Sequence, residues 1–136
     1  MAFLWFRGSA LPKKSYGFLA TFFIGWHMHS KHFEKKEPLG ESLDDFLILV
    51  LEFEGKRLAS FKVLQIHYSW EEVHEVLKYD TSHGYCHVHR YYKRLNALGE
   101  PLSGKEISQA SFEECRSDIK KNWQKYKAWY LKKWQR

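Results

Sequence analysis

The sequence predicts an α+β fold in which an antiparallel β-sheet carries a long C-terminal α-helix packed on one face. Three observations support this prediction. Side chains alternate with a period of two over residues 18–28, a continuous apolar run spans residues 46–53, and apolar residues recur every three or four positions after residue 111. The strand patterns come first and the helical pattern last, which is typical of a sheet covered by a helix.

The size and composition of the chain predict a single domain over residues 1–136. Aromatic residues make up 18% of the chain, which is high, and they can stack on flat ligands. The two cysteines, Cys86 and Cys115, form neither a disulfide framework nor a CxxC metal motif. The longest apolar run, 16–26, is too short to span a bilayer. We therefore expect a cytoplasmic protein without a membrane partner.

The residue pattern in the first third of the chain predicts one strand followed by a loop. Residues 1–15 form an apolar and then basic lead-in segment. The alternation over 18–28 predicts a half-buried strand. Residues 31–45 are predicted to be a loop, because the segment is charged and contains Pro38 and Gly40.

The middle of the chain predicts a series of antiparallel strands. The apolar run 46–53 predicts a central strand covered on both faces, and a hairpin turn at 54–56 leads to a return strand over 58–68. Residues 69–72 fit either a helix-capping box or a turn. We favour the turn followed by a strand over 73–79, because the segment is short.

The C-terminal segment 111–136 predicts a basic amphipathic helix that begins at a capping box, Ser-Phe-Glu-Glu, over 111–114. Its predicted apolar stripe comprises Phe112, Cys115, Ile119, Trp123, Tyr126 and Tyr130. The segment contains eight Lys or Arg and three acidic residues. Interleaved basic and aromatic residues suit nucleic acid or an acidic protein partner, and a solvated helix face is the alternative.

The predicted sheet region, 16–92, ends in a histidine-rich turn and strand over 78–92. Asp80 and His83 fall in the predicted turn, whose short polar residues and glycine favour a reversal. If the backbone is extended after Gly84, side chains alternate between faces. His87, His89 and Tyr91 then share one face, and Cys86, Val88, Arg90 and Tyr92 share the other.

Three interpretations of this stretch remain open. His87 and His89, roughly 6–7 Å apart on one strand face, could bind zinc or another divalent metal with His83 or Asp80 as a third ligand. Alternatively, the three histidines could act as metal-free acid–base groups, with Asp80 orienting His83 and Arg90 holding a phosphate. In the third interpretation the histidines are structural, and Asp80 caps the turn.

The pattern basic-Tyr-Asp-x-x-His-Gly-x-x-His-x-His-Arg over residues 78–90 resembles a signature of small uncharacterised bacterial and archaeal proteins. These are similar to the TumE-type toxins of toxin–antitoxin systems. The matching positions are Tyr79, Asp80, His83, Gly84, His87, His89 and Arg90. The resemblance covers roughly residues 46–134, and Lys78 stands where arginine is more usual. It implies strands before the signature, a helix after it, and an intracellular toxin held by a cognate antitoxin.

Together these observations predict a toxin-like protein that acts on nucleic acid, specifically a metal-independent ribonuclease. The predicted catalytic residues are Asp80, His83, His87, His89 and Arg90. The predicted nucleic-acid-binding residues are Lys78, Tyr91, Lys120 and Lys127. RNA and an antitoxin are the expected partners, and no cofactor is required in this mechanism. The alternatives are a binding module with structural histidines, and a metal-dependent hydrolase that uses zinc or another divalent ion.

Overall fold

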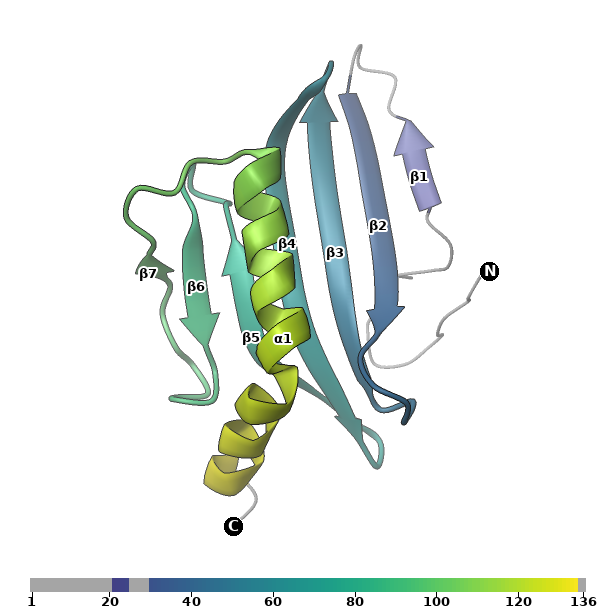
Figure 1. The fold of residues 1–136 in the computed structure, drawn as a ribbon, viewed down its shortest axis with the longest axis vertical. Coiled ribbons are helices and arrows are strands. Elements are labelled where there is room, and N and C mark those ends of the chain that lie inside the picture. The colour runs from purple at the N-terminus through teal and green to yellow at the C-terminus, as the bar shows by residue number, and fades with distance from the viewer. Residues whose placement is uncertain (1–20, 25–29, 135–136) are drawn as a thin grey trace.

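The computed structural model of the chain describes residues 21–24 and 30–134, which form one antiparallel sheet with a long helix on one face (Figure 1). The described strands follow the chain in order across the sheet, each pairing with the next. They are β1 (Thr21–Ile24), β2 (Ser30–Pro38), β3 (Asp45–Glu54), β4 (Arg57–Ser69), β5 (Glu72–Asp80), β6 (His87–Arg90) and β7 (Glu100–Pro101). The predicted α+β class is confirmed. The predicted lead-in at 1–15 lies outside the described residues.

The central hairpins follow the predicted pattern. β3 contains the apolar run 46–53, and its turn to β4 places Gly55 at φ +64°, a conformation that glycine adopts without a Cβ penalty. The ambiguous segment 69–72 forms the turn between β4 and β5 and not a helix. At the tip of that turn, Trp70 has φ +57° and is 97% exposed.

The prediction of a loop over 31–45 is wrong for most of its length, because β2 pairs with β3 from Ser30 opposite Glu54 to Pro38 opposite Phe46. Polar side chains of this strand have partners within it and across the sheet: His32 lies 2.8 Å from Glu34 of the same strand and 3.3 Å from Glu52 of β3. Pro38 is the last residue of the strand, where its missing N–H matters least.

The helix, α1, spans Gln109–Trp134 and begins two residues before the predicted capping box. Its N-terminus is closed by a reciprocal pair of serines. The Ser111 amide donates to Ser108 Oγ at 3.1 Å, and the Ser108 amide donates to Ser111 Oγ at 3.0 Å. Glu114, predicted to complete the box, instead forms an ion pair with Lys105. The capping residue is therefore Ser108.

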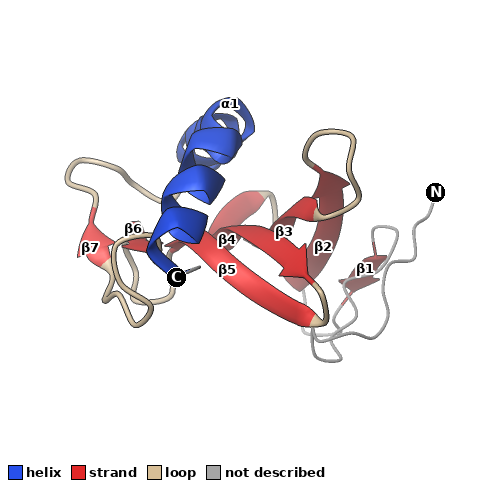
Figure 2. Cartoon of the chain, turned by 90° about the horizontal axis from the view of Figure 1, so that it is seen from below, coloured by secondary structure: helices blue, strands red, loops and turns tan. Residues whose placement is uncertain are grey.

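One face of α1 covers the centre of the sheet, over β4 and β5, and Figure 2 shows the helix on one side of the sheet. The predicted stripe is confirmed: Phe112, Cys115, Ile119 and Tyr130 are buried in the main core, and Trp123 and Tyr126 pack against it. None of the helices that the structure describes is long and apolar enough to cross a membrane.

Two buried acidic residues of the sheet anchor cations of the helix. Glu37 accepts hydrogen bonds from Arg116 and lies 3.7 Å from Lys120 Nζ. Asp45, which is fully buried, accepts hydrogen bonds from His67 Nδ1 at 2.8 Å and Lys127 Nζ at 2.9 Å. Burial alone would raise the pKa of the Asp45 carboxyl, but the bonds from His67 and Lys127 outweigh it and lower the pKa below its ordinary value. Arg116 and Lys127 of the helix therefore neutralise buried carboxylates of the sheet.

Candidate metal centre

The end of β5 and the whole of β6 bring the histidine-rich residues together. In the antiparallel register, Lys78 lies opposite His89 and Asp80 opposite His87. Residues directly opposite in such a pair project from the same face. The intervening Val88 belongs to the core under α1, so these four side chains lie on the face that points away from the helix.

A tight turn holds Asp80 in place between the two strands. The Ser82 amide donates to Asp80 Oδ1 at 2.9 Å, which leaves Oδ2 directed toward β6. Thr81 is buried and ties the turn to β4, because its hydroxyl accepts a hydrogen bond from the Phe61 amide at 2.9 Å. Gly84 has φ +87°, which completes the reversal at little steric cost.

Asp80, His87 and His89 each direct one potential ligand atom to a common point. These atoms all lie within 4.8 Å of one another, and His87 Nε2 is 4.0 Å from Asp80 Oδ2. Ligand atoms around one tetrahedral zinc ion lie roughly 3.3 Å apart, so modest side-chain rotations would bring the three donors to binding distance. Two imidazoles and one carboxylate form a donor set used for zinc and for non-haem iron.

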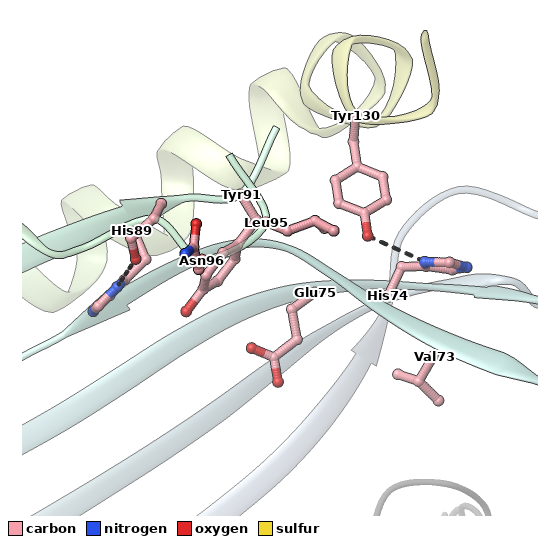
Figure 3. Close-up of a pocket in the computed structure, with 9 residues that line it drawn as sticks. Val73, His74, Glu75, His89, Tyr91, Leu95, Asn96 and Tyr130 are labelled. Atoms are coloured by element: carbon pink, nitrogen blue, oxygen red, sulfur yellow. Dashed lines mark hydrogen bonds between the residues drawn. The ribbon is translucent and has the colours of Figure 1, made fainter. Parts of the chain in front are cut away.

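Backbone carbonyls fix the protonation of both imidazole rings. His87 Nδ1 lies 3.3 Å from the Tyr85 oxygen. His89, which Figure 3 shows, has its Nδ1 3.0 Å from the Ala97 oxygen. A carbonyl can only accept, so each Nδ1 is the protonated nitrogen. In the neutral ring this leaves a lone pair on Nε2, which is the state a metal ligand requires.

The third predicted histidine, His83, lies at the margin of this group. It is exposed, and its ring stacks on that of His87 with a centroid distance of 5.6 Å. Asp80 was predicted to orient His83, whereas its carboxylate bonds to the Ser82 amide and faces His87. His89 in turn stacks on Tyr91 at 5.7 Å, which extends the row of rings.

The predicted cationic residues are divided between the two faces. Arg90 projects from the face opposite the imidazoles, because no bulge interrupts the register of β5 and β6, and its guanidinium pairs with Glu100. Arg90 therefore does not lie where it could hold a phosphate beside the imidazoles, as the metal-free interpretation required. Lys78 is the predicted cation that lies beside the candidate ligands, with Nζ 3.9 Å from Asp80 Oδ2.

Sequence reasoning missed the residues that cover the centre. The segment between β6 and β7 folds back so that Gly99 lies against both imidazoles. A Cβ at this position would lie 2.4 Å from His87 Cδ2 and 3.2 Å from His89 Nε2. No local pattern identifies Gly99, because its contacts arise only when the segment packs on β6.

Replacing Gly99 with alanine is therefore expected to displace the His87 ring. We expect zinc affinity, measured by isothermal titration calorimetry, to fall by roughly tenfold or more, as when groups that orient metal ligands are removed. Leu98→Ala is the matched control, because this neighbour is 83% exposed. Equal zinc affinities for the two variants would show that Gly99 does not position the imidazoles.

The fold and the site define an α+β protein with a candidate centre of two histidines and one carboxylate. The chain belongs to the family described as a domain of unknown function, DUF7718, whose model matches residues 28–136. The match includes the whole candidate centre and α1. No curated protein and no solved structure matches the chain. The likeness to TumE-type toxins stays a prediction.

Proposed function

We propose that this protein is a metal-dependent hydrolase in which Asp80, His87 and His89 hold zinc or another divalent ion. The observation that supports this proposal most directly is the convergence of three donor atoms within 4.8 Å. Three protein ligands leave a position for water, as in catalytic zinc sites. The ion would lower the pKa of that water and so supply a nucleophile at neutral pH.

The substrate that best suits the surroundings is a phosphodiester, as in RNA. A pocket of about 430 Å³ borders the covering segment and is lined by Lys93, Arg94 and Gly99, among others. Lys93 and Arg94 are exposed, so they are available to a phosphate backbone. Lys78 lies beside the candidate ligands and would stabilise negative charge there. A toxin acting on RNA and restrained by an antitoxin is consistent with this arrangement.

The reaction would be hydrolysis in one displacement. An ion held by Asp80, His87 and His89 would supply a deprotonated water to attack phosphorus, and the bond from phosphorus to the leaving oxygen would break. The leaving oxygen takes up a proton, so that one water is consumed for each bond cleaved. In this mechanism the Tyr85 and Ala97 carbonyls keep the two imidazoles aimed at the ion.

A metal-free ribonuclease is the second candidate, and the position of His83 favours it. This ring is exposed and stacks on His87. One imidazole would take the proton of the ribose 2′-hydroxyl as it attacks phosphorus, and the other would protonate the 5′-oxygen that leaves. The two candidates make opposite predictions about chelation.

The experiment uses the full chain, a single-stranded RNA oligonucleotide of mixed sequence, and His83→Ala and His89→Ala variants. We expect cleavage by the wild type, loss of cleavage in a chelator, and recovery on addition of zinc or manganese. His83→Ala should then retain activity and His89→Ala should lose it. Chelator-resistant cleavage that His83→Ala abolishes would establish the metal-free candidate. A chain that neither binds divalent ions nor cleaves RNA would reject both.

A further inference from the structure

An open pocket of about 540 Å³ adjoins the candidate metal centre at the free edge of β5 (Figure 3). β6 pairs only with Leu77 to Asp80, so the first half of β5 has no partner on that side among the described strands. The segment from Tyr91 to Ala97 supplies the opposite wall. His89 lines the pocket and also belongs to the candidate centre, so that a ligand in one would lie next to the other.

A β-bulge directs Glu75 to the face of the sheet that carries the candidate ligands. The register of β4 and β5 shifts between Gln65 and Ile66: Gln65 pairs with Leu77, and Ile66 pairs with Glu75. Val76 is the extra residue, and it is buried. Strict alternation would place Glu75 on the helix face together with Leu77. The bulge reverses this and aims its carboxylate into the pocket, a role that bulges often have beside functional sites.

Glu75 and Tyr91 form a pair of opposite hydrogen-bonding character. Their polar ends point into the same space (Figure 3), and Glu75 lies close enough to act on the phenol electrostatically. The phenol hydroxyl of Tyr91 can donate a hydrogen bond, and the carboxylate oxygens of Glu75 accept.

Part of the remaining wall is aromatic. Tyr130 and His74 meet edge to face, with ring centroids 5.5 Å apart, and the Tyr130 hydroxyl lies 3.1 Å from His74 Nδ1. The Tyr91 ring stands across the pocket from them (Figure 3). Aromatic walls of this kind accept unstacked bases of single-stranded RNA, which are then recognised at their edges.

We propose that this pocket binds a guanine base of the substrate. The Watson–Crick edge of guanine presents a carbonyl oxygen, a ring N–H and an amino group in a row. Tyr91 would donate to the oxygen, and the Glu75 carboxylate would accept from the two nitrogen donors. Adenine and cytosine lack this order of groups, and uracil lacks the amino group. The inference deepens the proposed function and rests on it for the claim that the bound base belongs to the substrate.

The test measures binding of the four nucleoside 5′-monophosphates by calorimetry, without RNA cleavage. We expect GMP to bind the wild type more tightly than AMP, CMP or UMP. Glu75→Gln should weaken GMP binding by roughly tenfold, because the matched acceptor is lost. Tyr91→Phe keeps the ring and should weaken it less. Glu71→Gln is the control, because Glu71 is exposed in the turn between β4 and β5.

The outcomes separate this inference from the proposed function. Equal binding of all four nucleotides, no binding of GMP, or GMP binding unchanged by Glu75→Gln would each overturn the guanine pocket. Zinc affinity of Glu75→Gln is measured as an independent test of the metal centre, since Glu75 is not among the three candidate ligands. In the wild type, normal zinc binding without GMP selectivity would refute the pocket alone. GMP selectivity without zinc binding would refute the metal centre alone.

Discussion

Replacing His87 with alanine is expected to reduce zinc affinity by at least roughly 100-fold, because one of three ligands is lost and binding energy at such sites is several kcal/mol per ligand. Asp80→Asn should have a similar effect while preserving the size of the side chain and the bond from the Ser82 amide. Isothermal titration with zinc measures both variants directly. RNA cleavage should fall with zinc occupancy.

His83→Ala is the matched control for this experiment. The ring comes from the same stretch and stacks on His87, but it is not one of the three candidate ligands. We expect it to bind zinc like the wild type. If His87→Ala binds zinc as tightly as His83→Ala does, the convergence of Asp80, His87 and His89 is structural, and the proposed centre is wrong.

Replacing Asp45 with asparagine is expected to destabilise the fold by about 3 kcal/mol, because it leaves Lys127 and His67 without their buried anionic partner. Urea unfolding at neutral pH, followed by tryptophan fluorescence, measures the difference. Asp44→Asn is the control, because this neighbouring side chain is exposed. A loss no larger than that of the control would show that the buried pair contributes little.

The same ion pair predicts a dependence of stability on pH. The pKa of Asp45 is lower in the folded chain than its ordinary value of 3.8, so its contribution is complete above that value. It is lost as the pH falls from about 3.8 toward the folded pKa. The difference in unfolding free energy between wild type and Asp45→Asn should therefore shrink below about pH 4. A difference that stays constant down to pH 2 would contradict this assignment.

Much of the fold could be predicted from periodicity, because β3, β4 and the buried stripe of α1 carry apolar patterns. The strand β5 was expected because its segment is short and not because of its pattern. β2 could not be predicted, because its side chains are largely charged and its stability comes from pairing with β3. The face shared by His87 and His89 followed from simple alternation, and Asp80 was singled out with them. Which residues would cover that face depended on tertiary packing, so Gly99 and the Ala97 carbonyl were missed.

The orientation of Glu75 and the ion pairs of α1 could not be predicted from the sequence, and both have physical reasons. Glu75 reaches the pocket through a bulge, and one extra residue in a strand inverts every expectation based on alternation beyond it. The basic helix suggested a nucleic-acid surface, but the anionic partners of Lys127 and Arg116 come from strands about 80 residues earlier in the chain. Charge composition alone does not reveal such pairing.

The segment between β6 and β7 covers the imidazoles, whereas α1 covers the main core on the opposite face of the sheet. Lifting the residues around Gly99 would break the bond between His89 and Ala97 but would leave the contacts beneath the helix intact. Under the proposed function, a substrate would thus reach the centre when a few local bonds break, while the core stays intact. Entry to the centre and global unfolding should respond separately to temperature and denaturant.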